Sequence, residues 1–444
     1  MSRGGRSDGT AHSEEKPSGL PGPGPEVSVS ANYLAGPQGL LWSINARAVL
    51  DVIDREGPLG RPEITRATGL SKTTVAQALR ELVARGAVEE AGADTTRRGP
   101  AATLYRIAPR CALALGVDIG HLRIRAVLVD AVGETLAQAE TRAPRRRVAD
   151  TAAAVAALAA ECAGRAGTEP GAVGQAVVGV RAVVARDGRT VRRAYGLPQG
   201  GRGLAEAIER DLPVPLLLEN DVNLAAVAEQ RFGACAGVAD FVLLGVGVGL
   251  GAGIVLGGRL HQGFAGGAGE VAFLPHPATE LGTEVLGARR IAEQARQAGI
   301  EGSPSTREIF DSARAGDERA LAVVDATARR IAHVAASVAL VIKPELFVLG
   351  GAFGASADLL LGRIRRHLAR DAAPLPIRIV ASGVPGDPVL RGASWLARHR
   401  ARERAFAAAV GGRPHETAAG GPYDTATGGP NDTDLTGAGK GDIT

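Results

Sequence analysis

Residues 243–270 form the stretch that most constrains the fold, and they read LLGVGVGLGAGIVLGGRLHQGFAGGAGE. Glycine alternates there with leucine and β-branched residues, which predicts the strands of a tight hairpin. Glycine lacks a Cβ atom and adopts positive φ at no cost, so this backbone can approach another group closely. Bare N–H groups in such a segment bind phosphates well. The same glycines would also let two strands pack closely against a neighbouring element, and the stretch alone leaves both interpretations open.

The length and the composition favour an α/β protein with more than one domain. A chain of 444 residues is too long for one ordinary domain and predicts two or three. Aromatic residues make up only 3% of the chain, so its cores must be built from small aliphatic side chains on many elements. The net charge of +4 is too small to indicate nucleic-acid or membrane binding, which would require a localised basic patch.

The cysteines and the apolar runs favour a cytoplasmic protein. Cys111, Cys162 and Cys235 are far apart and lack Cys-x-x-Cys spacing, so neither a disulfide framework nor a zinc site is indicated. No apolar run reaches the roughly 18 residues that a membrane span needs, and the first residues lack the apolar core of a signal peptide. We therefore expect no bound metal, no membrane partner and a cytoplasmic location.

Changes in composition divide the chain into four segments. Residues 1–36 and 411–444 are rich in Gly, Pro, Ser and charged residues without periodicity, which predicts two disordered tails. Between them, residues 37–110 have the pattern of a small helical domain, and residues 111–410 have that of a larger α/β body.

The pattern of residues 37–110 predicts a winged helix-turn-helix domain. One helix ends at Gly57-Pro58, and a short second helix begins with Pro62 and stops at Gly69. Ser71 caps a third helix, and the residues after position 88 supply a β wing. The third helix carries an apolar stripe at helical spacing, formed by Val75, Ala78, Leu79, Leu82 and Val83.

The polar face of the third helix has the side chains that read DNA. Gln77 and Arg80 can make paired hydrogen bonds to base edges in the major groove, and Lys72 at the helix start suits a phosphate. The other candidate DNA contacts are Ser71, Thr73, Thr74 and the wing-tip residues Arg97 and Arg98. The alternative is a winged helix that only docks another protein, with a merely solvated polar face.

The body begins with a strand that ends in Asp118, followed by a return strand in residues 122–130. Further strands are expected at residues 176–180 and 216–218, with a helix at 152–162 between them. Asn220 and Asp221 then lie at the start of a helix. Asp221 is placed to accept a proton from a substrate hydroxyl, although an acid that caps its own helix explains the same residue, and the two roles are compatible.

The C-terminal half of the body alternates helices and strands. Residues 286–342 are expected to be helical, and residues 344–351 to form a buried strand with a glycine turn. Another strand at residues 377–380 precedes a last helix that begins near Leu390.

Four motifs make the chain resemble the ROK family of sugar kinases and sugar-responsive repressors, from about residue 45 to 409. They are NARAVL with RATGLSKTTV and RRGPA, LLLENDVNLAAVAE, GVGLGAGIVLGGRLHQG with AGE, and VLRGASWLA. The first looks like the DNA-binding domain of the repressor branch, which the kinases lack. The resemblance implies two actin-like (ribonuclease H-like) lobes with a sugar cleft between them, and a homodimer or higher homo-oligomer.

The resemblance also assigns site residues. The sugar contacts it implies are Asn220, Asp221, Glu270 and Glu284, and the catalytic positions are Asp118 and Asp221. The positions that would face a nucleotide are Gly120, Gly249, Gly251, Gly350 and Gly351.

The chain departs from the kinase pattern where phosphate and zinc would bind. His121-Leu122 replaces the Gly-Thr of the first phosphate turn, and Val248 replaces a Thr in the hairpin, so two hydroxyls are lost. Arg181 begins the segment that replaces a Gly-x-Pro-Gly loop at the sugar site. The zinc-binding His would fall at Phe273 and the cysteine-rich loop is missing, so no zinc site of the usual kind is expected. His276 stands between two prolines and is expected to be a surface residue and not a ligand.

These features predict a DNA-binding transcriptional regulator that acts as a repressor. We expect a dimer on an inverted-repeat operator in double-stranded DNA, a degenerate body that responds to a sugar or sugar phosphate, and no cofactor. The alternative is an ATP-dependent sugar kinase with an appended DNA-binding domain. A third possibility is a body that has lost ligand binding and only dimerises.

Overall fold

The computed structural model describes residues 37–94, 102–276, 284–371 and 376–411. The two expected tails lie outside the described residues, except for Gly411. No helix in the described part of the chain is both long enough and apolar enough to cross a membrane.

The N-terminal domain is a winged helix. Its three-stranded sheet has the order β1-β3-β2, and the strands are antiparallel. Its elements are α1 (Pro37–Glu56), β1 (Leu59–Gly60), α2 (Arg61–Thr68), α3 (Lys72–Ala84), β2 (Val88–Asp94) and β3 (Ala102–Ile107).

The capping residues expected in this domain are present. Pro62 lies in the first turn of α2, and Gly69 ends that helix in the left-handed conformation, with φ of 69°. The hydroxyl of Ser71 accepts a hydrogen bond from the backbone N–H of Thr74 and so caps α3. One stripe residue was predicted wrongly: Val83 is 38% exposed, because it lies at the edge of the apolar face of α3.

The first lobe of the body is a five-stranded sheet of order β10-β7-β4-β5-β6. β4, β5 and β6 form an antiparallel meander, while β7 runs parallel to both β4 and β10. A separate hairpin, β8 with β9, follows β7. The elements are β4 (Leu113–Ile119), β5 (Arg123–Asp130), β6 (Thr135–Arg142), α4 (Val148–Arg165), β7 (Val173–Val180), β8 (Ala182–Val184), β9 (Val191–Ala194), α5 (Leu204–Asp211) and β10 (Leu216–Asn220).

The second lobe is another five-stranded mixed sheet, of order β13-β12-β11-β14-β15. β11 pairs antiparallel with β12 and parallel with β14. The elements are α6 (Asp221–Phe232), β11 (Phe241–Val246), β12 (Leu250–Leu256), β13 (Arg259–Leu260), α7 (Ala288–Gln297), α8 (Thr306–Arg314), α9 (Glu318–Ile342), β14 (Leu346–Gly350), α10 (Ala357–Asp371) and β15 (Ile379–Ala381). The last helix, α11 (Pro388–Ala409), follows β15 and returns to the first sheet.

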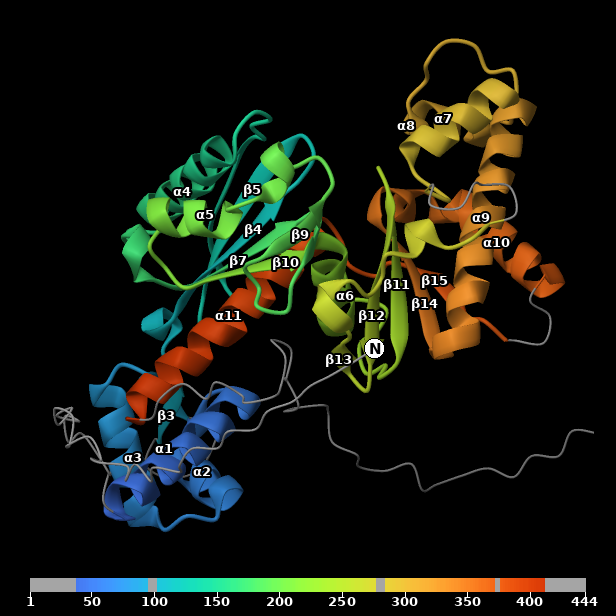
Figure 1. The fold of residues 1–444 in the computed structure, drawn as a ribbon. Coiled ribbons are helices and arrows are strands. Elements are labelled where there is room, and N and C mark those ends of the chain that lie inside the picture. Colours follow the sequence, from blue (N-terminus) through green and yellow to red (C-terminus); the bar gives the residue numbers. More distant parts are fainter. Residues whose placement is uncertain (1–36, 95–101, 277–283, 372–375, 412–444) are drawn as a thin grey trace, which may run out of the picture. The chain divides into compact units, whose positions relative to one another are not determined.

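Helices cover both sheets (Figure 1). α4 and α5 lie on one face of the first sheet, and α11 packs against β4 and β7. α6 packs on β11 and β12 of the second sheet and also against α11. Two lobes with this pattern of sheets and helices confirm the expected two-lobed α/β body.

The glycine-rich stretch forms the hairpin of β11 and β12, as predicted, and the close-packing interpretation of its glycines is confirmed. A Cβ at Gly253 would lie 2.6 Å from the Cβ of Ala226, so this glycine lets β12 pack closely on α6. A Cβ at Gly249 would meet nothing within 4 Å, and this glycine lines a cavity. Positive φ occurs in this stretch only after the hairpin, at Gly257, Gly258, Gly263, Gly266 and Gly269, as well as at Ala265.

Candidate DNA-binding helix and ligand pocket

The exposed face of α3 carries the expected DNA contacts. Lys72, Gln77 and Arg80 are exposed, and no described side chain forms a hydrogen bond or ion pair with Lys72 or Arg80. Gln77 makes one long contact, 3.4 Å from Nε2 to Oε1 of Glu81. These three side chains are therefore available to a partner that lies along the helix.

The remaining candidates at the start of α3 are tied to one another. The hydroxyl of Ser71 lies 2.8 Å from the hydroxyls of both Thr73 and Thr74. This cluster stabilises the helix N-terminus, where backbone N–H groups and the helix dipole favour a phosphate. The wing-tip candidates Arg97 and Arg98 lie outside the described residues.

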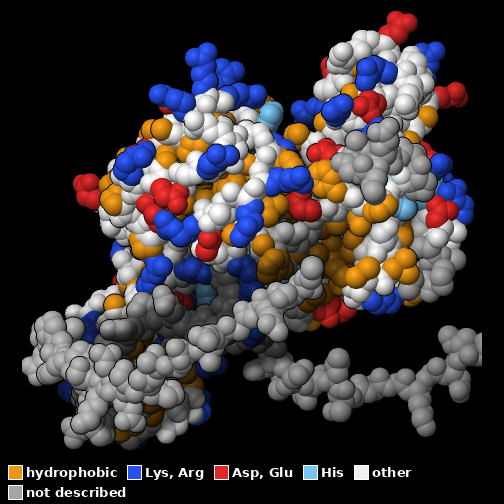
Figure 2. All heavy atoms as spheres, viewed as in Figure 1, with side chains coloured by type: hydrophobic (Ala, Val, Ile, Leu, Met, Phe, Trp, Pro, Cys, Tyr) orange, Lys and Arg blue, Asp and Glu red, His pale blue; other side chains and the backbone are white. Residues whose placement is uncertain are grey.

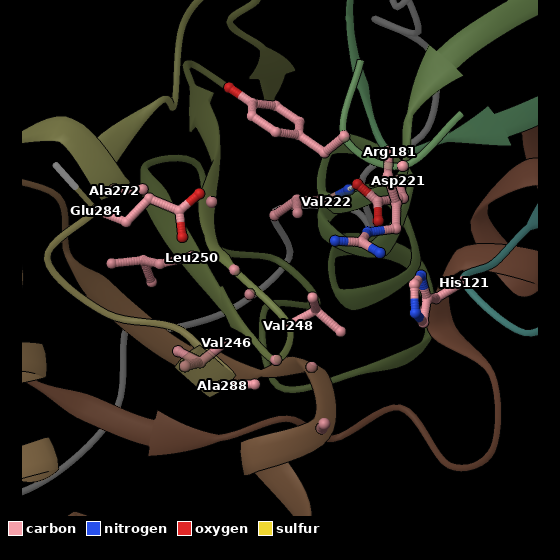
Figure 3. Close-up of a pocket in the computed structure, with 18 of the residues that line it drawn as sticks. His121, Arg181, Asp221, Val222, Val246, Val248, Leu250, Ala272, Glu284 and Ala288 are labelled. Atoms are coloured by element: carbon pink, nitrogen blue, oxygen red, sulfur yellow. Dashed lines mark hydrogen bonds between the residues drawn. The ribbon is translucent and has the colours of Figure 1, made fainter. Parts of the chain in front are cut away.

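A cavity of about 820 Å³ in the body brings the four expected sugar contacts together (Figure 3). Asn220 and Asp221 reach it from the junction of β10 and α6. Glu270 reaches it from the segment after β13, and Glu284 from the segment before α7. The volume is ordinary for a small-molecule site. Residues far apart in the sequence thus line one pocket.

Asn220 caps α6. Its Oδ1 accepts hydrogen bonds from the backbone N–H groups of Val222 and Asn223, and its Nδ2 donates to the carbonyl oxygen of Ala182. Both acceptor positions of Oδ1 are therefore used by the helix, and only the second Nδ2 proton is left for a ligand. The N-cap of α6 is Asn220 and not Asp221. The alternative explanation of Asp221 as the residue that caps this helix is therefore wrong.

Asp221 has an unusual carboxyl group. Burial raises its pKa to about 7, and the nearby charge of Asp118 adds to this effect, while the charge of Arg181 opposes it. Its Oδ1 accepts one hydrogen bond of 2.9 Å, from the backbone N–H of Val222. A carboxyl group that titrates near neutral pH beside a pocket can exchange a proton with a ligand hydroxyl.

Asp118 lies behind the pocket and is paired. Only 4% of the residue is exposed, and its Oδ2 accepts a hydrogen bond of 2.8 Å from Arg125. Arg125 also forms an ion pair of 2.7 Å with Asp387, the N-cap of α11. Burial raises the pKa of Asp118 to about 6, and Asp387 raises it further, while Arg125 lowers it. Asp118 does not line the pocket, so it is positioned to affect Asp221 through its charge.

Glu270 is oriented by Tyr195, which the sequence did not predict as a site residue. The hydroxyl of Tyr195 donates a hydrogen bond of 2.6 Å to its Oε2. Burial raises the pKa of Tyr195 to about 12, as does the hydrogen bond to Glu270. Tyr195 follows β9, and no local motif marks it. Arg289, Arg290 and Glu293 at the start of α7 also line the pocket without a sequence signal.

The two phosphate turns carry no hydroxyl side chain. His121 lines the pocket, with Leu122 beside it 64% exposed, and Val248 lines the pocket and is 53% exposed. The candidate nucleotide positions Gly249, Gly251 and Gly351 also line it. Gly120 lines a small adjacent cavity, and Gly350 ends β14 next to Gly351. A nucleotide triphosphate would find backbone N–H groups here, but neither of the two expected hydroxyls.

Phe273 and His276 lie in the segment where the resemblance would place a zinc site. Phe273 packs under the guanidinium of Arg193, 5.3 Å from the ring centroid. His276 is half-buried and in edge contact with His333, so its expected position as a simple surface residue is wrong. Burial and the charge of Arg330 lower its pKa to about 4. Among the residues that the structure describes, no group of three or more His, Cys, Asp or Glu side chains could hold a metal.

Comparisons with known proteins agree with this architecture. The ROK family model matches residues 114–400, and the MarR family model matches residues 43–99. The putative xylose repressor of a Caldicellulosiruptor species is 24% identical over 365 residues, which cover 76% of this chain and 90% of that protein. The glucokinase of Streptomyces coelicolor is 29% identical over 58% of this chain and 87% of that protein.

Two solved structures share the fold. A ROK family transcriptional regulator, described as a homologue of the Escherichia coli MLC protein, aligns with a TM-score of 0.67 and 22% identity over 83% of this chain and 99% of that one. A ROK family glucokinase from Streptomyces griseus, in complex with glucose and AMPPNP, aligns with a TM-score of 0.57 and 26% identity over 65% of this chain and 100% of that one. The chain belongs to the ROK family and joins a winged-helix DNA-binding domain to the ROK body.

Proposed function

We propose that this protein is a transcriptional repressor whose winged helix binds an inverted-repeat operator as a homodimer, and whose ROK body responds to a sugar or sugar phosphate. One observation carries the proposal. A winged helix with a free polar face on α3 is joined to a body that keeps four sugar-facing polar residues but lacks both phosphate-turn hydroxyls. The relatives named as xylose repressors support the same conclusion, and the protein would act in the cytoplasm.

DNA recognition would use α3 as the helix that enters the major groove. Arg80 and Gln77 would read base edges, while Lys72 and the capped N-terminus of α3 would bind phosphates. Because a homodimer presents two copies of α3 related by a two-fold axis, the operator would contain two inverted half-sites.

Helix α11 offers a route from the pocket to the winged helix. Its first residues, Pro388 and Val389, line the pocket. Near its other end, Glu403 accepts two hydrogen bonds of 2.9 Å from Arg47 of α1, and Arg402 pairs with Asp54 of the same helix. A ligand that favours one arrangement of the lobes would shift α11 and thereby alter operator affinity.

A direct experiment tests the proposal. Genomic fragments retained by the purified full-length protein are sequenced with and without a panel of sugars and sugar phosphates. Retention of a common inverted repeat, released by one member of the panel, is the expected result. Retention without sequence preference would contradict the operator, and retention that no ligand changes would contradict the effector.

A second function, ATP-dependent sugar phosphorylation, is favoured by one observation. The pKa of Asp221 near 7 suits a general base for a sugar hydroxyl, and glucokinases are among the relatives. The absent hydroxyls at Leu122 and Val248 weigh against it, because phosphoryl transfer depends on positioning the phosphates. A coupled ADP-release assay over the hexoses separates the two functions. Sugar-dependent turnover that Asp221→Ala abolishes would establish a kinase, and we expect none.

A further inference from the structure

One cation in the pocket has no hydrogen-bonded counter-ion among the described side chains. Arg181 directly follows β7, and its side chain is half-buried and lines the pocket beside Asp221 (Figure 3). The backbone of Arg181 is held in place by a hydrogen bond of 2.8 Å, which its carbonyl oxygen accepts from the backbone N–H of Tyr195. Within the described part of the chain, no side chain forms a hydrogen bond or an ion pair with its guanidinium.

The acids near Arg181 do not neutralise it. Asp118 is already paired with Arg125 at 2.8 Å, and Arg125 in turn pairs with Asp387. Burial raises the pKa of Asp221 to about 7, so this carboxyl carries only part of a charge at neutral pH. A half-buried guanidinium without a bound counter-charge is costly, because guanidinium groups are rarely buried unless they are paired.

The positive charge on this wall comes from arginine. His121 lines the same pocket, and burial and the charges of Arg181 and Arg145 lower its pKa, so the imidazole is neutral and leaves the charge to the arginines. Figure 2 shows Arg side chains over the visible face of the first lobe, with some acidic side chains between them. On the second-lobe side, Glu270 and Glu284 supply carboxylate oxygens, which accept hydrogen bonds from hydroxyl groups.

We infer that the pocket binds an acidic sugar, whose carboxylate or phosphate group pairs with Arg181 while its hydroxyls face Glu270 and Glu284. The planar guanidinium presents two parallel N–H donors, which match the oxygens of either anion. Binding would supply a hydrogen-bonded counter-charge, which none of the described side chains gives to Arg181. This inference rests on the proposed sugar-sensing function and narrows it to ligands with an anionic group.

Matched pairs of ligands test the inference on the full-length protein. The probes are glucose with glucose 6-phosphate and glucuronate, galactose with galacturonate, N-acetylglucosamine with its 6-phosphate, and inorganic phosphate. Calorimetric titration and thermal shift measure binding to the wild type and to Arg181→Ala, Arg181→Lys and Arg202→Ala. Arg202 is the charge-matched control, because it is an exposed arginine of the first lobe and is not among the residues that line the pocket.

An acidic member should bind more tightly than its neutral partner, and Arg181→Ala should weaken it roughly 10- to 100-fold. Arg181→Lys should recover part of this loss, and Arg202→Ala should change little. Comparing the affinities of the sugar phosphates with those of the sugar carboxylates identifies which anionic group the pocket prefers. Equal binding of neutral and acidic members, or binding that Arg181→Ala leaves unchanged, would overturn the inference while leaving sugar sensing intact.

Two further outcomes of these titrations concern sugar recognition itself. Inorganic phosphate that binds as tightly as every sugar would show an anion site without sugar recognition, and would overturn the inference. If no probe binds while operator DNA is still retained, both the acidic ligand and the sugar-sensing function are overturned, and the DNA-binding function stands.

Discussion

Tyr195 donates a hydrogen bond to Glu270 across the two lobes, with 2.6 Å between its hydroxyl and Oε2. Tyr195 follows β9 of the first lobe, and Glu270 follows β13 of the second. The pKa of Tyr195 is raised to about 12 by burial and by this contact, so the hydroxyl keeps its proton at physiological pH. The bond therefore fixes one oxygen of Glu270 and leaves the other for a ligand.

Tyr195→Phe should weaken sugar binding about five-fold, because Glu270 loses the donor that orients it and one hydrogen bond contributes on the order of 1 kcal/mol. Calorimetric titration with the best ligand of the panel measures the effect. Tyr105→Phe is the control, since the Tyr105 hydroxyl accepts a hydrogen bond of 2.7 Å from Arg61 within the winged helix. Unchanged affinity in Tyr195→Phe, or an equal loss in both variants, would refute the role of this contact.

Replacing glycine by alanine should affect the stability of the protein differently at two positions of the β11–β12 hairpin. A Cβ at Gly253 would lie 2.8 Å from the carbonyl oxygen of Val222 and 2.6 Å from the Cβ of Ala226, both on α6. Gly253→Ala should therefore lower the free energy of unfolding by about 1–3 kcal/mol through overpacking. Gly249→Ala should change it by less than about 0.5 kcal/mol, because the added Cβ meets nothing within 4 Å. Urea denaturation of both variants checks the ranking, and the reverse order would be inconsistent with the packing described.

The raised pKa of Asp221 predicts a loss of stability with rising pH. Its folded-state pKa of about 7 exceeds the unfolded value of 3.8. The folded state therefore holds the proton more tightly, and stability falls as pH rises from about 4 to 7 and then levels off. Asp221→Asn removes this loss and should raise the free energy of unfolding at pH 8 by on the order of 1–3 kcal/mol, with a smaller gain at pH 5.

Asp187, whose pKa is lowered in the folded protein, provides the control for this experiment. Burial alone would raise the pKa of Asp187, but hydrogen bonds from Thr190 outweigh burial and lower it. Asp187→Asn should therefore reduce stability at pH 8, opposite in sign to Asp221→Asn. Denaturant titrations at both pH values measure the two differences. A pH-independent effect of Asp221→Asn would contradict the raised pKa.

The helix starts and strands of the fold could be predicted because their signals are local. Ser71 caps α3, and Asn220 caps α6, directly after the apolar strand β10. The alternation of glycine with leucine and β-branched residues identified the β11–β12 hairpin. These features depend on neighbours within a few residues, so the sequence contains them directly.

The unpredicted part of the site depends on contacts between distant segments. Tyr195 is 75 residues from Glu270, and only the folding of two lobes around one cavity brings them together. His276 was expected at the surface because two prolines flank it, but α9 places His333 against its ring. The sequence identifies Arg181 as the start of a replaced loop, but that no described side chain forms a hydrogen bond or ion pair with it depends on the three-dimensional surroundings alone.

The ion pair between Arg47 and Glu403 predicts a variant that separates ligand binding from DNA binding. Glu403→Gln removes one of the two ion pairs between α11 and α1, at a cost of about 0.5–1 kcal/mol for a partly exposed pair. Ligand affinity should be unchanged, while the ligand-dependent change in operator affinity should shrink. Glu89→Gln is the control, because Glu89 pairs with Arg106 between β2 and β3, inside the winged helix. Fluorescence anisotropy with labelled operator, with and without ligand, measures the response, and a full response in Glu403→Gln would argue against α11 as the connection.

The polar face of α3 predicts two distinguishable DNA-binding defects. Arg80 is exposed and has no partner among the described side chains, so it is free to bond a base edge, and Lys72 lies in the first turn, where a phosphate would bind. Arg80→Ala should weaken operator binding by about 1–3 kcal/mol and relax the preference at one base pair. Lys72→Ala should weaken binding to all sequences and reduce the slope of log affinity against log salt by about 1.

Salt titrations on the operator and on a scrambled duplex distinguish these two defects. Arg307→Ala is the charge-matched control, because Arg307 is an exposed arginine on α8 in the body, and it should leave both duplexes unaffected. Equal losses on the two duplexes for Arg80→Ala would show a phosphate contact in place of base readout. A loss confined to the operator for Lys72→Ala would move the base-reading role to the N-terminus of α3.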